Sequence, residues 1–191
     1  MKLWLNCLTS KVFLLREGVK SKGCVYLTNS DRLHFGKDVL LGNNVKIMSR
    51  FHNSKVQIGN HVCIRDFVEI NAKGGTLTIE DYCFIARGVW IGGMGSLLIG
   101  QNTMIGIGTV VVSSDHNYNF ISIPYYDLSE IAKPINIGKN VWIGANSVIL
   151  GGTNIGDGSV VAAGSVAEGE YPENVLLAGV PAVIKKTINR L

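Results

Sequence analysis

The sequence has no apolar run long enough to cross a membrane, and it has few cysteines. Both features limit the classes of protein to which the chain can belong. No stretch approaches the roughly 18 consecutive apolar residues of a membrane span. Four cysteines stand among 191 residues without CxxC spacing, which favours a reduced cytoplasmic setting over a secreted disulfide scaffold. The formal net charge of +4 is small and scattered, so no nucleic-acid partner is expected.

Two common signals of other protein classes are also missing. No Asn-Gly pair separates alternating apolar runs, and Asp157-Gly158 lies inside a different repeat, so a hairpin-built β-sandwich is not indicated. The chain has no GxSxG motif, which excludes the nucleophile elbow of serine hydrolases.

What the sequence does contain is an aliphatic residue at every sixth position. From residue 137 onward these positions are Ile137, Ile143, Ile149, Ile155 and Val161. An α-helix does not repeat every six residues, and an amphipathic strand repeats every two. A period of six fits short strands separated by corners in a chain that winds repeatedly around one axis.

The same spacing extends backward through most of the chain. Earlier sets comprise Ile58, Ile64 and Ile70; Ile79, Ile85 and Ile91; and Ile99, Ile105 and Val111, with a weaker coil from Phe35. Three hexapeptides complete one coil, which predicts an all-β, three-sided column of about six coils with these aliphatics at the axis. We assign it to residues 35–172, between an N-terminal segment (1–34) and a C-terminal segment (173–191). Cys83 occupies an inward position and is expected to be a core thiol.

One long excursion interrupts the repeat. Ile99 and Ile137 are 38 positions apart, whereas one coil needs 18, and we place a protruding loop at residues 117–133. His116 directly precedes it, at a predicted coil corner with the side chain pointing outward. Long loops in compact proteins are often functional. The loop residues Asn117, Tyr118 and Tyr125 suit a sugar ring, although its aromatics could equally anchor the loop to its own or a neighbouring subunit.

Several motifs together resemble a known family. The repeat, the lone histidine before the loop, VWIGANSVILGG (141–152), AAGSV (162–166) and AGVPA (178–182) resemble the left-handed parallel β-helix acyltransferases, most closely the galactoside and maltose acetyltransferase group of sugar O-acetyltransferases. The resemblance covers about residues 35–186. It implies a left-handed winding, acetyl-CoA as co-substrate, no required metal, and a homotrimer with active sites between neighbouring columns.

The resemblance also implies roles for individual residues. His116 would be the general base, because an imidazole can accept and return a proton near neutral pH. Asp115 could orient that ring or merely face solvent, and a backbone carbonyl could hold the ring equally well. Acetyl-CoA would lie along Trp142, Gly144, Ala145, Ala163, Gly164 and Ser165, with its phosphates near Lys185 and Lys186 on a short C-terminal helix. Some relatives carry an asparagine near position 87; here Arg87 stands there, and Asn71 is the nearest alternative for holding the acceptor.

Residues 1–17 have apolar residues at roughly helical spacing. This segment is interpreted either as a cap on the open end of the column or as an amphipathic helix that touches a membrane surface. Its polar interruptions argue against a signal peptide.

The sequence therefore predicts a cytoplasmic, acetyl-CoA-dependent O-acetyltransferase that acts on a saccharide hydroxyl, in surface-polysaccharide synthesis. The alternatives are an N-acetyltransferase acting on an amino-sugar nucleotide and a non-catalytic β-solenoid scaffold. A zinc carbonic anhydrase of the same fold is disfavoured, because the histidine spacing supplies no three-ligand set.

Overall fold

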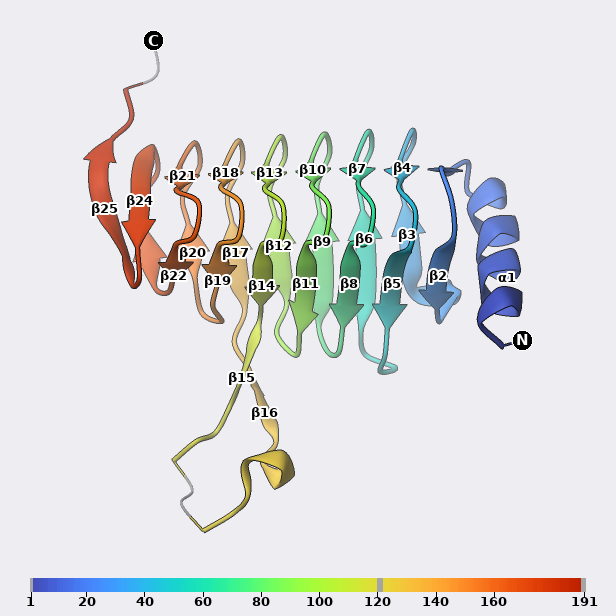
Figure 1. The fold of residues 1–191 in the computed structure, drawn as a ribbon, viewed down its shortest axis with the longest axis horizontal. Helices are drawn as coiled ribbons and strands as arrows, with labels where there is room; N and C mark the ends of the chain where they lie inside the picture. The colour runs from blue at the N-terminus through green and yellow to red at the C-terminus, as the bar shows by residue number, and fades with distance from the viewer. Residues whose placement is uncertain (1, 120–121, 190–191) are drawn as a thin grey trace.

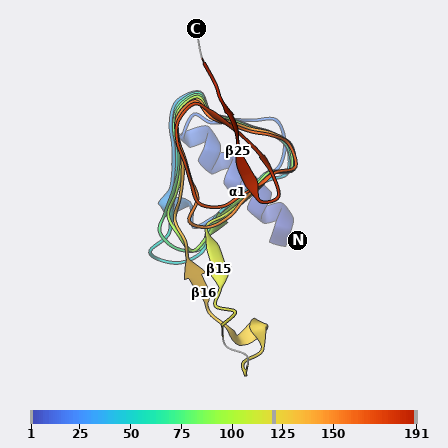
Figure 2. The same cartoon turned by 90° about the vertical axis from the view of Figure 1, so that its left-hand side faces the viewer.

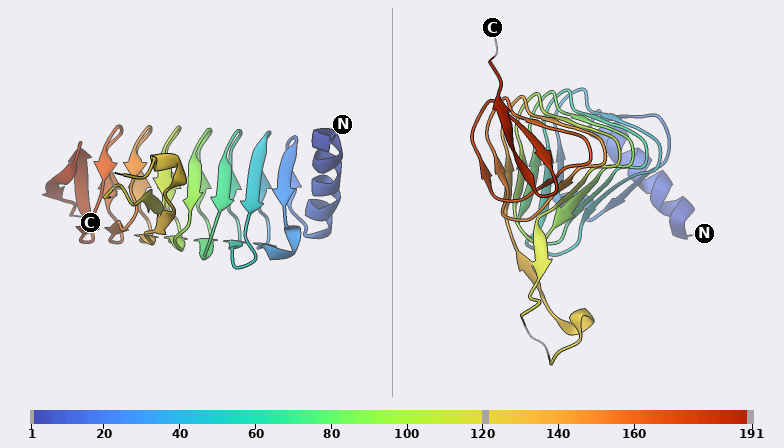
Figure 3. Two further views of the ribbon diagram at one scale, coloured as in Figure 1. Left: turned by 90° about the horizontal axis from the view of Figure 1, so that it is seen from below. Right: turned by 60° about the vertical axis from the view of Figure 1, so that its left-hand side comes forward.

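The sixfold spacing of aliphatic residues builds three parallel sheets that wind around a common axis (Figure 1). The computed structural model describes residues 2–119 and 122–189, with side chains described for residues 9–119, 122–124 and 126–189. Each coil contributes one strand to sheet A, then one to sheet B, then one to sheet C. Viewed toward its end, the column has a triangular cross-section (Figure 3).

The strands are short, and each pairs with its equivalents in the coils before and after it. Sheet A contains β1 (Lys20–Ser21), β4 (Leu40–Leu41), β7 (Cys63–Ile64), β10 (Phe84–Ile85), β13 (Met104–Ile105), β18 (Trp142–Ile143), β21 (Val160–Val161), β24 (Val175–Gly179) and β25 (Ala182–Thr187). Sheet B contains β2 (Val25–Thr28), β5 (Val45–Ser49), β8 (Glu69–Ala72), β11 (Trp90–Gly93), β14 (Val110–Val112), β19 (Val148–Ile149) and β22 (Val166–Ala167). Sheet C contains β3 (Leu33–Phe35), β6 (Lys55–Ile58), β9 (Thr76–Ile79), β12 (Leu97–Ile99), β17 (Ile135–Ile137), β20 (Asn154–Ile155) and β23 (Glu170–Tyr171).

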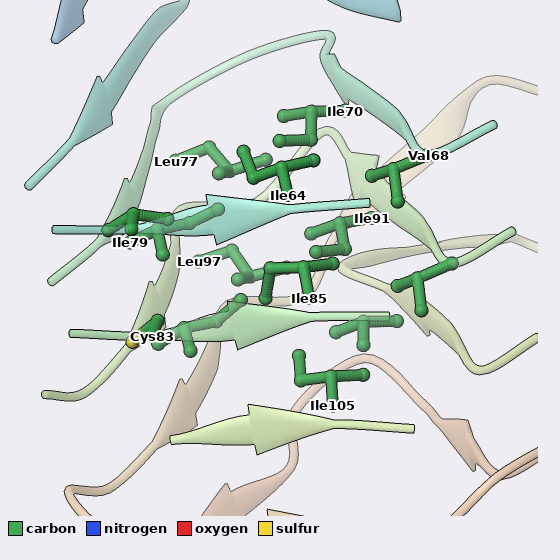
Figure 4. Close-up of a cluster of buried hydrophobic side chains, with 14 of the residues drawn as sticks. Ile64, Val68, Ile70, Leu77, Ile79, Cys83, Ile85, Ile91, Leu97 and Ile105 are labelled. Atoms are coloured by element: carbon green, nitrogen blue, oxygen red, sulfur yellow. The ribbon is translucent and has the colours of Figure 1, made fainter. Parts of the chain in front are cut away.

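The predicted aliphatics form the core. Ile64, Ile85 and Ile105 are paired in register through β7, β10 and β13, and each exposes 0% of its surface. Figure 4 shows these three side chains one above another inside the column. Cys83 is buried beside them, as expected. Stacking of identical positions in successive coils thus removes a continuous column of apolar surface from water, which is the main stabilising contribution to this fold.

The three-sided parallel β-helix is confirmed, but its extent differs from the prediction. The coils begin at Lys20 rather than at residue 35, and they make about seven turns rather than six. The first coil contains the irregular η1 turn (Ser30–Arg32) in place of a clear hexapeptide, so the repeat pattern does not predict it. At the other end, β24 continues sheet A beyond residue 172.

The predicted C-terminal helix is wrong. Residues Ala182–Thr187 form β25, which runs antiparallel to β24. The chain turns back at Gly179, where φ is 113°, a conformation that favours glycine. Without β25, the last strand of sheet A would present unpaired backbone groups, and the β-branched Val183 and Ile184 suit a strand that covers this edge.

The opposite end of the column carries α1 (Lys2–Arg16) (Figures 1 and 2). Leu14 is buried against the first coil, and the Ser10 hydroxyl accepts a hydrogen bond from the backbone N–H of Leu27 at 3.1 Å. Val12 and Leu15 point outward, each 69% exposed. The helix therefore covers the first coil while leaving apolar side chains in solvent. No helix among the described residues combines the length and apolar character needed to cross a bilayer.

Some cysteines are free thiols and another is in a disulfide bond. Cys63 and Cys83 are free thiols, whereas Cys24 is disulfide-bonded. The spacing of the four cysteines gave no indication of that bond.

Candidate active site

The corners between sheets B and C, which we call the B/C corners, form a row along one edge of the column. Three successive corners carry Arg50–Ser54, Lys73–Gly75 and Met94. In the next coil the corner is replaced by a hairpin of β15 (Ser114–His116) and β16 (Glu130–Ala132), which projects away from the column (Figures 1 and 3). The long excursion thus starts at Ser114, three residues earlier than predicted.

The base of the hairpin is fixed to the column by buried hydrogen bonds. Ser113 is buried, its hydroxyl donates its one proton to the carbonyl oxygen of Gly95 at 2.8 Å, and the carbonyl oxygen of Gly92 lies 3.2 Å away. The backbone N–H of Lys133 donates to the Ser113 carbonyl at 2.9 Å. Since β15 begins directly after Ser113 and β16 ends directly before Lys133, these bonds hold both ends of the hairpin on the column.

His116 lies on this hairpin and not on a coil corner, which corrects its predicted position. Its side chain is exposed, and Nδ1 lies 3.2 Å from the carbonyl oxygen of Leu128. A carbonyl oxygen can only accept a hydrogen bond, so the neutral ring that satisfies this contact carries its proton on Nδ1. The free lone pair is then on Nε2, the nitrogen that can act as a base.

Among the described residues, the structure has no hydrogen bond or ion pair between the Asp115 carboxylate and the His116 ring. Asp115 Oδ1 accepts a hydrogen bond from the backbone N–H of His116 at 2.8 Å, and its Oδ2 pairs with Lys133 Nζ at 3.0 Å. The hydrogen bond from Lys133 lowers the pKa of the Asp115 carboxyl below its ordinary value. Of the two ways of holding the ring considered from the sequence, the structure shows the backbone carbonyl, and Asp115 instead stabilises the hairpin backbone.

A cavity of about 950 Å³ separates the hairpin from the row of B/C corners. Its lining consists of Arg50, Phe51, Lys73, Met94, His116, Tyr126, Leu128, Ser129 and Glu130. Within it Lys73 Nζ lies 2.5 Å from Glu130 Oε1, and Ser114 donates to Glu130 Oε2 at 2.9 Å. Burial opposes ionisation of Glu130, but these two hydrogen bonds together with the nearby positive charge of Lys73 hold the pKa of the carboxyl below its ordinary value.

Only some of the residues predicted to bind the acceptor lie near the cavity beside His116. Asn71 is 4% exposed, and its Oδ1 accepts a hydrogen bond from Arg50 Nε at 3.1 Å, so it reaches the cavity through Arg50. Asn117 and Tyr118 follow His116 on the hairpin, with Tyr118 65% exposed. Arg87 lies on another corner, its guanidinium 5.0 Å from the centre of the Phe67 ring. The side chain of Tyr125 lies outside the described residues.

The residues predicted to bind acetyl-CoA lie on a different edge, at the corners between sheets A and B. Trp142 is 51% exposed on β18, and Ala145, Ala163 and Gly164 follow in two stacked corners, where the Gly164 N–H donates to the Ala145 carbonyl at 2.9 Å. This exposed indole beside small residues fits a slender, partly apolar chain such as pantetheine. Gly144 and Ser165 are buried, and Lys185 and Lys186 are exposed on β25.

Coil packing alone explains the glycine at position 144. A Cβ atom there would lie 2.4 Å from the backbone nitrogen of Ala163 in the next coil, far inside normal contact distance. Its presence in the motif therefore follows from the fold and gives no separate indication of a ligand.

Sequence reasoning missed several residues of the cavity. Arg50, Phe51, Lys73 and Met94 come from coils that precede His116 by 22 or more positions. The extra residues at these corners, which lengthen the repeat, were the available signal. Among the described residues, no group of three or more His, Cys, Asp or Glu side chains is placed to hold a metal ion.

The sequence is similar to those of several known acetyltransferases. Residues 134–166 match the family model described as "Hexapeptide repeat of succinyl-transferase". The chain is 29% identical over 198 residues to "Putative lipopolysaccharide biosynthesis O-acetyl transferase WbbJ" of Escherichia coli K12, covering 99% of this chain and 88% of that protein. It is 30% identical over 128 residues to "Putative colanic acid biosynthesis acetyltransferase WcaF" of the same strain, with 67% of each chain covered.

A solved structure shows the same fold with a bound thioester. A hexapeptide-repeat-containing acetyltransferase from Vibrio cholerae O1 biovar eltor, complexed with acetyl-CoA, is 26% identical with a TM-score of 0.53, covering 96% of this chain and 79% of that one. The chain spans about half the length of a mycobacterial relative to which it is 30% identical over 148 residues. From these similarities, the chain belongs to the hexapeptide-repeat acyltransferase family, close to its sugar O-acetyltransferases.

Proposed function

We propose that this protein transfers an acetyl group from acetyl-CoA to a hydroxyl of a saccharide, in the synthesis of a surface polysaccharide. The observation that carries the proposal is the position of His116. Its imidazole is exposed at the wall of a large cavity, with Nδ1 held by a carbonyl and Nε2 left as the basic nitrogen. The names of the two Escherichia coli relatives support a glycan acceptor.

The chemistry asked of His116 is a proton relay. Nε2 takes the proton of the acceptor hydroxyl as its oxygen attacks the thioester carbonyl carbon. The resulting tetrahedral intermediate collapses with cleavage of the carbon–sulfur bond, and the imidazolium returns the proton to the departing thiolate. The Leu128 carbonyl keeps its hydrogen bond to Nδ1–H throughout, and this bond stabilises the imidazolium while it exists.

A complete site would need more than one copy of the chain. His116 projects from the B/C corners, whereas Trp142, Ala145 and Ala163 lie at the A/B corners, and sheet B separates the two edges. A neighbouring column that brings its A/B edge to this hairpin would join base and acetyl donor. The proposal therefore includes the homotrimer that the family resemblance implies, with one site at each of three interfaces.

Two further expectations belong to the same proposal. An enzyme that uses acetyl-CoA is expected in the cytoplasm, where its co-substrate is made. The outward Val12 and Leu15 of α1 would let the N-terminal helix touch a membrane surface, which would suit a lipid-linked acceptor. Sedimentation with vesicles of the wild type and of a Val12→Ser, Leu15→Ser double variant tests that contact.

The test of the activity is acetyl transfer itself. The purified protein is incubated with acetyl-CoA and a panel of saccharides, release of free thiol is followed, and the product mass is measured. We expect a gain of one acetyl group on acceptors that carry only hydroxyls, and a loss of about 10²–10⁴-fold in rate for His116→Ala. His34→Ala, an exposed histidine on sheet C, is the control and should keep its rate.

The outcomes separate the alternatives. Transfer that requires an amino sugar would replace the proposed O-acetylation with N-acetylation. Full activity of His116→Ala would remove His116 from the mechanism, and absence of thiol release with every acceptor would leave a non-catalytic scaffold.

A further inference from the structure

The cavity beside His116 contains one positive charge that no carboxylate compensates. Arg50 Nε donates to Asn71 Oδ1 at 3.1 Å. A guanidinium has five N–H donors, so four remain on the two terminal nitrogens. Within the described part of the chain, no Asp or Glu oxygen lies within 4.0 Å of this side chain.

The other cations near the hairpin are already paired. Lys73 binds Glu130, and Lys133 binds Asp115 at 3.0 Å. Each of these pairs contributes no net charge. The uncompensated charge on the cavity wall is therefore that of Arg50, on the side that faces the hairpin carrying His116.

The corner that carries Arg50 is held in place by buried groups. The Ser54 side chain is 0% exposed, accepts a hydrogen bond from the Phe51 N–H at 3.0 Å, and lies 2.9 Å from the Ser49 hydroxyl. Arg32 Nη1 donates to the Phe51 carbonyl at 2.7 Å from the preceding coil. Because Asn71 is itself buried, both the backbone and the Nε atom of Arg50 are fixed before any ligand arrives.

We propose that Arg50 binds an anionic group of the acceptor, so that the saccharide acetylated at His116 carries a carboxylate or a phosphate. A fixed guanidinium with free terminal N–H groups matches both anions, since each can accept two parallel hydrogen bonds. Phe51, Met94 and Tyr126 supply apolar surface around it for the faces of a sugar ring. The inference rests on the proposed function and narrows its substrate class.

The experiment compares acceptors that share one ring and differ in charge. Methyl glucoside, methyl glucuronide and glucose 1-phosphate, with the corresponding galactose series, are tested for acetyl transfer and, separately, for binding by calorimetry without acetyl-CoA. For the wild-type protein, we expect both the KM and the dissociation constant to be about tenfold lower for an anionic acceptor than for the neutral one. The carboxylate and phosphate members show which anion is the ligand.

Variants of Arg50 connect the preference to this residue. Arg50→Gln should abolish the preference for the anionic acceptor by raising its KM about tenfold, while the KM for the neutral acceptor stays the same. Arg50→Lys should keep part of the preference. Lys55→Gln, which removes an exposed charge from β6, is the matched control and should behave as wild type. Thermal unfolding of each variant confirms that the fold is retained.

The two proposals fail in different ways. The proposal of an anionic acceptor is overturned if neutral and anionic saccharides bind equally well, or if Arg50→Gln weakens binding of all acceptors to the same extent. Either result leaves the proposed acetyl transfer intact. Anion binding that is lost in Arg50→Gln, without acetyl transfer to any acceptor, supports the anion site and overturns the proposed activity.

Discussion

Lys73 and Glu130 are 57 positions apart in the chain, yet Lys73 Nζ donates a hydrogen bond to Glu130 Oε1 across the cavity beside His116. Glu130 pairs with His116 in the hairpin register, and Ser114 also donates to its carboxylate. This contact joins a B/C corner two coils away to the strand that opposes the proposed base. The hairpin is therefore held over the cavity from one side by Lys73 and at its base by Ser113.

We expect Lys73→Met and Glu130→Gln to lower acetyl transfer by similar amounts, because each releases the same hairpin. A double-mutant cycle should give a coupling free energy on the order of 1 kcal/mol, since both side chains are mostly buried. The measurement is kcat/KM for the two single variants and the double variant. Additive effects would show that the pair does not act as a unit.

Trp142 should contribute to binding of acetyl-CoA if the A/B edge carries the donor. Trp142→Ala is expected to raise the KM for acetyl-CoA about tenfold or more, with little change in kcat at saturation. The control is Phe84→Ala, which removes another aromatic from the outer face of sheet A. An unchanged KM in Trp142→Ala would assign the indole to subunit packing alone.

The ion pair between Asp115 and Lys133 predicts a specific pH dependence. Because Lys133 lowers the pKa of Asp115 in the folded protein, the pair stabilises the hairpin above about pH 4, the ordinary range of an aspartate. That stabilisation is lost as the pH falls through the lowered value. Titration of the Asp115 carboxyl by NMR should show its midpoint rising in Lys133→Met; an unmoved midpoint would contradict the pairing.

Cys63 and Cys83, both free thiols, should react at different rates. Burial raises the pKa of the Cys83 thiol to about 11, and Sγ donates to the Gly100 carbonyl at 3.1 Å. At pH 8 we expect iodoacetamide to modify the half-buried Cys63 first and Cys83 only after unfolding. Since the unfolded thiol ionises first, Cys83 should also lower the free energy of unfolding above about pH 9. Mass spectrometry of peptides from the native protein measures the order of labelling.

Ile105 and Ile107, which are two positions apart, test the assignment of inward and outward residues. Ile105 exposes 0% of its surface and Ile107 exposes 59%. Ile105→Ala should lower the free energy of unfolding by about 2–5 kcal/mol through lost burial and a cavity, whereas Ile107→Ala should change it by less than about 0.5 kcal/mol. Urea unfolding measures both. A similar loss in both variants would indicate that Ile107 is covered by another subunit.

The sequence by itself determined the winding of the chain. A residue such as Ile85 or Ile143 must be buried, and only a three-sided coil buries an aliphatic at every sixth position. The same spacing isolated one excursion and the single histidine beside it. These are local and periodic properties of the amino-acid sequence, so they do not depend on contacts between distant residues.

Tertiary structure alone decided what surrounds His116. Arg50 and Lys73 reach the cavity because their corners stack in line with the hairpin, and that alignment depends on how the coils stack. The Leu128 carbonyl, rather than Asp115, holds the imidazole because the hairpin folds back on itself. At the C-terminus, the basic segment Ala182–Thr187 was predicted to be a helix but forms β25. In this conformation it makes hydrogen bonds to the backbone of β24, the last strand of the column.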